Sequence, residues 1–245
     1  HFIPILSMTS TPHHADIPIP TWEDWSRVAS IDDGKYFSKP VRNYNYKFQH
    51  DWNKKHPIAI FRGASTGVGT TTDTNMRLKI AKISHQLNRP EFLDAGITKW
   101  NLRPRLHIEQ NKIVMKTIDP DSFDFSLVNE LTPEEQSNYR YIINIPGHSC
   151  AYRLSLELSM GSVIFLVESK YTLWFHKYLQ PNVHYIPVKS DLSDLLQQID
   201  WARGHDEECQ SIAKNSLEFY NKFLKKDGIF DYLQSLCTHI SSISG

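Results

Sequence analysis

A turn of small residues is the feature of this sequence that most clearly could do chemistry. Residues 141–145 form a short apolar run, Gly147 breaks it, helix formers occupy residues 151–160, and a second apolar run follows at residues 162–167. This pattern predicts a β-α-β unit with Ser149 as the helix cap. Because open α/β sheets bind ligands at such turns, the exposed amides and the helix dipole favour an anion such as a diphosphate.

Two charged residues extend this candidate anion site. Arg153 lies one turn into the predicted helix, so its guanidinium could bind the same phosphate through charge-assisted hydrogen bonds. Glu168 directly follows the second strand, where a carboxylate can accept both hydroxyls of a ribose. The competing interpretation is a plain β-α turn, with Arg153 paired to a surface acid and Glu168 at a helix N-terminus.

A second small-residue loop, GASTGVGTTTDTN, follows a predicted strand at residues 58–61. Its candidate phosphate or sugar contacts are Gly63, Thr66, Gly67 and Gly69. The loop lacks the Lys of a P-loop, which argues against an ATPase, and the alternative is a flexible surface loop. Arg77 begins the helix predicted over residues 76–87.

Composition excludes several classes of protein. Lys plus Arg and Asp plus Glu number 27 each, so no net charge attracts nucleic acid or a membrane surface. The three cysteines are few, odd in number and widely spaced, which argues against a disulfide scaffold or a zinc site and favours a reducing compartment. Apolar runs are far shorter than the ~18 residues of a membrane span. The histidines lack metal-ligand spacing.

The elements that must position these residues alternate between strand and helix in the second half of the chain, which predicts a parallel sheet covered by helices. The expected strands are residues 2–6, 58–61, 92–93 with 96–100, 112–118, 141–145, 162–167 and 183–188. The expected helices are residues 76–87, 133–138, 151–160, 173–179, 191–202, 207–223 and 229–243, with a short one holding Trp22 and Trp25.

Four sequence blocks occur in order and together resemble glycosyltransferase family 90, the capsule-associated and Rumi-like protein O-glucosyltransferase group. They are FRGASTG at 61–67, INIPGHSCAYR at 143–153, VESKY at 167–171 and VHYIPVKSDLSDLLQQIDWA at 183–202. DIPIPTWEDW at 16–25 is similar to that group's segment of Asp, Pro and paired Trp. The resemblance covers nearly the whole chain.

The resemblance implies an α/β fold of GT-B type, with two Rossmann-like lobes and parallel sheets. Residues 57–226 would form the C-terminal lobe that binds the UDP-sugar. Residues 1–56 would form an incomplete acceptor-side lobe, against which residues 227–245 pack back. It also implies metal-independent, inverting transfer to a glycan or protein hydroxyl, with no cofactor and a β-linked product. The donor is UDP-xylose or UDP-glucose, and the capsule-type character of FRGASTG favours xylose.

The short chain, without a signal peptide or cysteine framework, looks like a virus-encoded or microbial member. We therefore expect it in the cytoplasm, the host cytoplasm if it is viral, with a nucleotide sugar and a glycan or glycoprotein as partners.

The chain departs from the family pattern in two places. The catalytic base of Rumi-like enzymes is an Asp in an Arg-Asp-x-Pro stretch upstream of the segment that matches residues 2–6, and this chain lacks that stretch. Either further N-terminal residues carry it, or Asp16 or Asp24 serves instead. Where Rumi-like members have an Arg, this chain has Ser65, and Arg77 could replace it as in capsule-type members.

Trp22 and Trp25 could form an apolar wall against a sugar, although core packing is an equal alternative.

Three other interpretations stay open. Ser149 resembles an α/β-hydrolase nucleophile, with Asp194 or Asp206 and His239 in the right chain order. The motif Asp119-Pro120-Asp121 imitates the Asp-x-Asp of metal-dependent GT-A transferases. Finally, the chain could be a module that holds a nucleotide sugar or glycan without transferring it.

Overall fold

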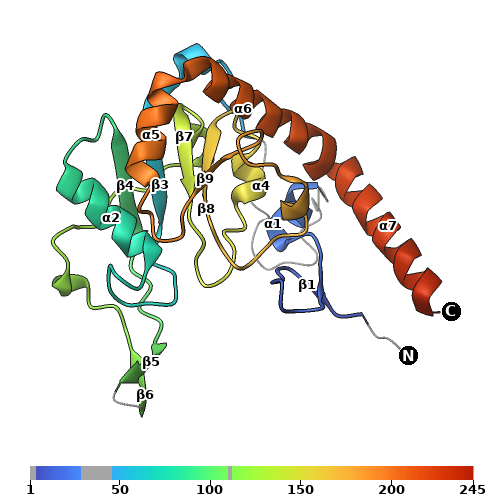
Figure 1. The fold of residues 1–245 in the computed structure, drawn as a ribbon, viewed down its shortest axis with the longest axis horizontal. Coiled ribbons are helices and arrows are strands. Elements are labelled where there is room, and N and C mark those ends of the chain that lie inside the picture. Colours follow the sequence, from blue (N-terminus) through green and yellow to red (C-terminus); the bar gives the residue numbers. More distant parts are fainter. Residues whose placement is uncertain (1–3, 29–45, 110–111, 245) are drawn as a thin grey trace.

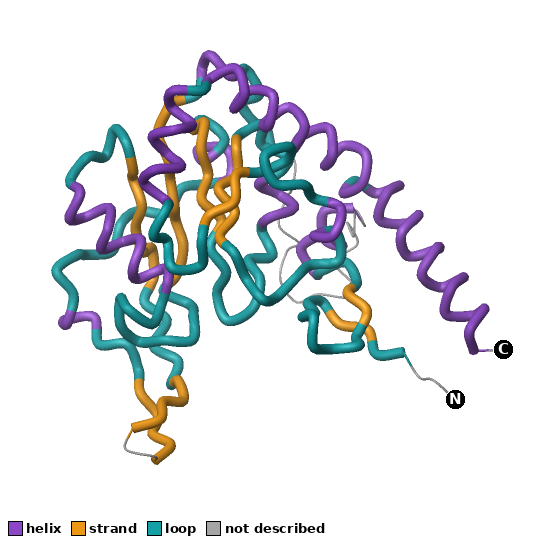
Figure 2. Tube along the Cα trace, viewed as in Figure 1, coloured by secondary structure: helices purple, strands orange, loops and turns teal. Residues whose placement is uncertain are grey.

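A five-stranded parallel sheet forms the centre of the molecule in the computed structural model, which describes residues 4–28, 46–109 and 112–244 (Figure 2). The strand order is β4-β3-β7-β8-β9. The strands are β3 (His56–Ala64), β4 (Leu93–Lys99), β7 (Tyr139–Asn144), β8 (Val163–Val167) and β9 (Ile186–Val188). Every residue of β8 is buried, as expected for a strand covered on both faces.

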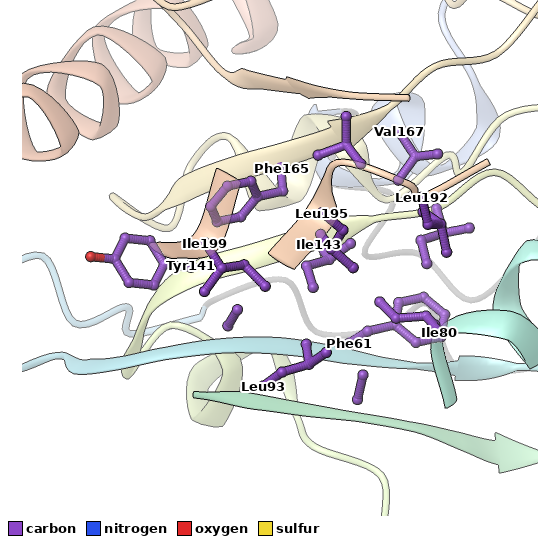
Figure 3. Packing of buried hydrophobic residues seen from close by; sticks show 14 of the residues in the cluster. Phe61, Ile80, Leu93, Tyr141, Ile143, Phe165, Val167, Leu192, Leu195 and Ile199 are labelled. Carbon is purple, nitrogen blue, oxygen red and sulfur yellow. The ribbon is translucent and has the colours of Figure 1, made fainter. Parts of the chain in front are cut away.

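Alternate residues of the strands pack into two separate clusters, one on each face of the sheet. Phe61, Tyr141 and Phe165 point into the first cluster, which α2 (Met76–Leu87) and α5 (Leu195–Gly204) cover (Figure 3). Ile142 and Ile164 point into the second, which contains residues of α4 (Leu154–Glu157) and the start of α7 (Lys226–Ser244). The sheet is therefore the middle layer of a doubly wound fold.

The strand order reverses direction between β3 and β7. β3 pairs with β4 on one side and with β7 on the other, in the register Ala59–Tyr141 and Ile60–Ile142. The chain leaves β3 through α2 toward β4, whereas it leaves β7 through α4 toward β8. Loops that depart in opposite directions leave a crevice at the carboxyl ends of the two strands, which is where folds of this kind bind ligands.

Helix α2 has the boundaries that the sequence predicts. The Asn75 side chain accepts hydrogen bonds from the amides of Arg77 and Leu78, and Asn88 ends the helix in the left-handed conformation at φ 50°. The helix predicted at residues 151–160 is shorter than expected: α4 spans only Leu154–Glu157, and Ser149 does not cap it. After α4 the chain continues in tighter turns, with the Ser159 amide bonded to the Leu156 carbonyl and the Met160 amide to the Glu157 carbonyl.

The remaining elements connect or flank this core. The strand predicted at residues 112–118 is β6 (Lys112–Lys116), and it pairs with β5 (Arg105–Glu109), which was not predicted, in a projecting antiparallel hairpin (Figure 1). The others are α3 (Pro133–Gln136), α6 (Asp206–Phe219), a π-helical turn (Tyr220–Leu224) and the 3₁₀ turns η1 (Trp52–Lys54), η2 (Pro120–Ser122) and η3 (His176–Tyr178).

The N-terminal part contains β1 (Leu6–Ser7), which pairs in parallel with β2 (Ile17–Pro18), and α1 (Trp22–Val28). Residues 2–3 of the strand predicted at 2–6, and residues 29–45, lie outside the described part. Helix α7 contacts this segment, because the Tyr232 hydroxyl donates to the Pro18 carbonyl at 2.6 Å. The α/β class and the parallel, helix-covered sheet are thus confirmed, while the two-lobed GT-B arrangement and the domain boundaries stay predictions.

Candidate functional site

Arg77 joins the two loops that flank the crevice between β3 and β7. Its Nη2 donates to the carbonyl oxygen of Ile145 at 2.8 Å, and its Nε donates to that of Pro146 at 3.3 Å, both just after β7. Its Nη1 donates to the Thr66 hydroxyl at 2.6 Å and to the Ala64 carbonyl at 3.1 Å, at the end of β3. The residue predicted to replace a family arginine therefore fixes the geometry of both loops.

Positive charge accumulates at this crevice. Burial, followed by the neighbouring Arg153 guanidinium, lowers the pKa of Arg77 to about 9, against the opposing influence of Glu157. The pKa of His148 is also lowered, first by burial and then by nearby arginines that include Arg105 and Arg77. An anion bound here would relieve the repulsion among these groups, which makes the crevice suited to a phosphate.

The glycines of the two loops allow them to approach one another closely. A Cβ on Gly147 would lie 2.8 Å from Thr66 Oγ1 and 3.6 Å from Arg77 Nη2, so only glycine fits there without displacing Thr66. Gly67 has a φ of 151°, which favours glycine. Gly63 lies on β3 beside the ring of Phe61. The two loops therefore lie side by side, whereas their predicted contacts with a phosphate or a sugar stay predictions.

Arg153 is the N-cap residue of α4, whereas the sequence predicted it one turn inside the helix. Its Nε pairs with Glu157 Oε1 at 2.7 Å, and its Nη1 donates to the carbonyl oxygen of Arg62 in β3. Its guanidinium also lies 5.4 Å from the centre of the Phe61 ring. Within the described part, Nη2 is buried and has no hydrogen-bond partner. Arg153 therefore keeps a buried donor without a partner among the described residues, although a buried acid already neutralises its charge, and its side chain lines a separate cavity together with Glu157.

A cavity of about 370 Å³ opens beside this crevice at the carboxyl ends of β7, β8 and β9. Glu168 lines it at the end of β8, as predicted, and Tyr185 lies nearby. Burial raises the pKa of Tyr185, and the carboxylate of Glu168 raises it further. The rest of the wall is mainly apolar or weakly polar and includes Pro146, Cys150, Leu166, Val167, Tyr171, Thr172, His176, Pro181 and Pro187. The volume falls in the ~300–1,000 Å³ range of small-molecule sites.

Asp16 lies in a second cavity, of about 390 Å³, which adjoins the first because Tyr171 lines both. Its carboxylate accepts hydrogen bonds from the hydroxyls of Ser7 and, at 3.1 Å, Ser10. The hydrogen bond from Ser7 is the main reason that the pKa of Asp16 lies below its ordinary value. Asp16 is therefore an ionised carboxylate next to the 370 Å³ cavity, and a general base must be ionised before it can accept a proton.

Asp24, the other candidate for the base, is a buried structural residue. Its carboxylate pairs with Arg27 at 2.6 Å and accepts hydrogen bonds from Ser155 Oγ at 2.6 Å, Trp174 Nε1 at 3.0 Å and the Thr21 amide at 2.9 Å. These contacts fasten α1 to the Rossmann-like lobe. With its oxygens fully engaged, Asp24 cannot receive a proton from an acceptor, so this candidate is dropped.

The two tryptophans predicted to form one wall point in different directions. Trp22 is 62% exposed, whereas Trp25 packs edge-on against Phe230 of α7 with ring centres 5.9 Å apart. Core packing is thus the better interpretation for Trp25, while Trp22 is available on the surface.

The alternative sites, a hydrolase triad around Ser149 and a metal site at Asp119-Pro120-Asp121, are not supported by the structure. Ser149 follows the carboxyl end of β7, whereas Asp206 pairs with Arg140 near the amino end of the same strand, and His239 is exposed on α7. The side chain of Asp119 caps the η2 turn by accepting a hydrogen bond from the backbone amide of Asp121. No group of three or more His, Cys, Asp or Glu residues within the described ranges has the arrangement of a metal site.

Sequence analysis missed two residues that build the site. Arg105 is 4% exposed, and its guanidinium donates to the carbonyls of Gly67 at 2.7 Å and Ser65 at 2.9 Å, which holds the glycine-rich loop in place. His176 lines the 370 Å³ cavity from η3. Neither residue belongs to a local motif, because their partners are brought to them only by the fold.

Comparison with known proteins places these features in a family. Residues 1–244 match the profile described as "Glycosyl transferase family 90". The chain is 45% identical to Uncharacterized protein 035R of Invertebrate iridescent virus 3 over 95% of its own length and 21% of that protein. It is 47% identical to Protein O-glucosyltransferase 2 of Danio rerio over 76% of its own length and 32% of that protein.

Among solved structures, the crystal structure of TarM aligns with 81% of this chain and 37% of its own, at a TM-score of 0.47 and 10% identity. The chain spans about a fifth to a third of the lengths of the two sequence relatives named above. In the part of the chain that the structure describes, no helix combines the length and apolar character needed to cross a membrane.

Proposed function

The chain belongs to glycosyltransferase family 90, and from this premise we propose that it is a UDP-sugar-dependent, inverting glycosyltransferase. Family membership and the O-glucosyltransferase relatives support glycosyl transfer. The proposed reaction moves xylose, or alternatively glucose, from the UDP-sugar to a hydroxyl of a glycan or protein and forms a β-linkage. The acceptor oxygen forms the new bond to the anomeric carbon as the bond to the diphosphate breaks, and a base takes the acceptor proton.

The observation that carries this proposal is the cationic crevice at the reversal of strand order. The departing UDP gains negative charge as the sugar leaves, and cations held in a fixed position stabilise it. Arg77 is fixed by hydrogen bonds to both loops, and Arg153 lies close enough for its charge to lower the pKa of Arg77. A diphosphate above Gly147 and Ser149 would meet both residues. This arrangement supplies charge stabilisation from side chains, so we propose that transfer needs no metal or other cofactor.

The neighbouring cavity offers a place for the nucleoside. Its volume and its apolar walls suit a base and a ribose, and Glu168 is placed to accept the ribose hydroxyls. The loop of Gly63, Thr66 and Gly67 would then lie beside the phosphates or the sugar. The FRGASTG sequence of this loop is the basis for preferring xylose to glucose.

The acceptor would enter on the side of the N-terminal segment. Asp16 is the proposed base because it is ionised and its cavity shares Tyr171 with the nucleoside cavity. The alternative is a carboxylate from further N-terminal residues. Trp22 is the exposed aromatic residue that could pack against a sugar.

A donor screen tests the proposal. Calorimetry should show UDP binding, and UDP-xylose or UDP-glucose should release UDP when an acceptor is present. The Glu168→Gln variant should weaken UDP binding by about 1–2 kcal/mol because a carboxylate accepts hydroxyl hydrogen bonds more strongly than an amide. The control is Glu91→Gln, an exposed acid paired with Arg89.

UDP binding without release from either donor would favour the non-catalytic binding module, and absence of UDP binding would refute the proposal. Whether the protein acts in the cytoplasm stays a prediction of the sequence.

A further inference from the structure

The imidazole of His176 is held in one tautomer by the protein backbone. The Leu173 amide donates a hydrogen bond to His176 Nδ1 at 2.8 Å. An amide N–H can only donate, so Nδ1 must present its lone pair. The neutral ring consequently carries its proton on Nε2, and that nitrogen can act only as a donor.

Packing keeps this ring neutral and in place. Burial lowers the pKa of His176 to about 4, so the ring stays uncharged at physiological pH. The ring lies nearly parallel to that of Phe175, with an angle of 8° and centres 5.7 Å apart. Within the described part of the chain, Nε2 makes no hydrogen bond and is not sealed away from solvent, while the residue lines the 370 Å³ cavity.

We propose that the Nε2–H of His176 is the fixed donor that makes this cavity select a nucleobase edge bearing a carbonyl group, uracil in preference to cytosine. The inference rests on the proposed function, since it assumes that a nucleoside occupies the cavity, and it assigns the residue that would choose the base.

The selection follows from the difference between the two pyrimidines. Uracil presents a carbonyl oxygen at the position where cytosine presents an amino group. A locked Nε2–H donates to the oxygen, but it faces the amino group donor to donor and leaves both unpaired. The apolar lining residues Pro146, Leu166 and Pro187 would pack on either base alike, so shape alone does not distinguish the two. A donor whose tautomer cannot switch therefore separates bases that have nearly the same shape.

Titration of the full chain with UDP and with CDP tests this inference. His176→Leu should weaken UDP binding about 3- to 10-fold, as expected for one lost hydrogen bond, and should leave CDP binding nearly unchanged. The matched control is His184→Leu. His184 also accepts a backbone amide at Nδ1, from Gln180 at 3.0 Å, but it is not part of the cavity wall. This control should keep the wild-type ratio of UDP to CDP affinity.

Nitrogen NMR of protein labelled with ¹⁵N-histidine provides a readout that does not depend on the variant's folding. The spectrum of the wild-type protein should show His176 with its proton on Nε2, and UDP should shift that nitrogen more than Nδ1.

Several results would overturn the inference. Equal loss of UDP and CDP affinity in His176→Leu would mean that the residue only supports the turn, and an Nδ1-protonated ring would remove the donor. If the wild-type chain binds UDP but does not prefer it to CDP, this inference fails alone. If it binds neither nucleotide, the proposed function fails with it.

Discussion

The guanidinium of Arg77 donates to the carbonyl oxygen of Ile145 at 2.8 Å, and this contact ties the loop after β3 to the loop after β7. The two loops leave the sheet in opposite directions, so without such a tie they would be free to separate. One side chain thus sets both the width of the crevice and its charge.

Arg77→Lys should lower both stability and UDP affinity. A single ammonium group cannot reach the carbonyls on both loops as the planar guanidinium does, so some of these acceptors would be left unpaired. We expect the free energy of unfolding to fall by about 2 kcal/mol, as measured by urea denaturation. An unchanged denaturation midpoint would show that the loops do not depend on this residue.

Gly147→Ala should weaken UDP binding by about 1–2 kcal/mol, since the new Cβ displaces Thr66 from its hydrogen bond with Arg77. Calorimetry measures the change. The control is Gly204→Ala in α5, where an added Cβ meets nothing within 4 Å. If both variants bind UDP as well as wild type, the close approach of the loops has no role in binding.

Asp16→Asn should reduce the rate of sugar transfer by about 10²-fold or more while leaving UDP affinity intact, because the amide cannot take the acceptor proton. Steady-state rates and calorimetry distinguish the two effects. Full activity in this variant would place the base on another segment of the protein.

Asp24→Asn should instead lower the thermal unfolding midpoint, because Asp24 holds Arg27, Ser155 and Trp174 together. A change in the rate of transfer without a change in stability would contradict this structural role.

EDTA should leave UDP release unchanged, since we assign stabilisation of the diphosphate to Arg77 and Arg153. The assay compares initial rates with and without chelator, followed by addition of Mn²⁺ or Mg²⁺. Complete loss of activity that either ion restores would reverse the assignment.

Stability should rise with pH between about 7 and 8.5 because of Lys55. Its ammonium group is buried and donates to the carbonyl of Ser137, the carbonyl of Met160 at 2.9 Å and the Ser162 hydroxyl at 3.1 Å. Burial lowers its pKa from 10.5 to about 7. Above pH 7 the unfolded chain binds the proton that the folded chain has released, so raising the pH favours folding.

Over this interval the gain should be about 1–2 kcal/mol, and Lys55→Met should abolish it. The pH interval ends below the ordinary pKa of a cysteine thiol, because above it Cys150 and Cys209 would ionise in the unfolded chain. In the folded chain, burial raises the pKa of both thiols to about 12. Urea denaturation at several pH values makes the comparison, and an equal rise in both proteins would assign the effect to other groups.

The sequence predicted those parts of the molecule whose signals are local. Asn75 caps α2 and apolar residues recur at helical spacing, so its boundaries could be read directly. Short apolar runs form the middle of β3 and β7, and turns of small residues follow both strands. The chemistry of the crevice followed from these turns, because a parallel sheet brings the carboxyl ends of its strands to one edge.

The features that the sequence could not predict depend on partners far along the chain. Asp24 looked like a free acid, but the fold brings it Ser155 and Trp174, which are 131 and 150 residues away. Arg105 begins β5, and its acceptors are backbone carbonyls, which no side-chain pattern reveals. Likewise, α4 is shorter than the helix formers around it predict.

The pairing of Ala59 with Tyr141 also bears on how the chain folds. Parallel neighbours so distant in sequence form slowly, since a long intervening segment must be closed before their contacts are made. The two halves of the nucleotide crevice therefore come together only when this pairing is complete. Nucleotide affinity should appear in the last phase of refolding, and bound UDP should slow the unfolding of the whole lobe, not merely of its loops.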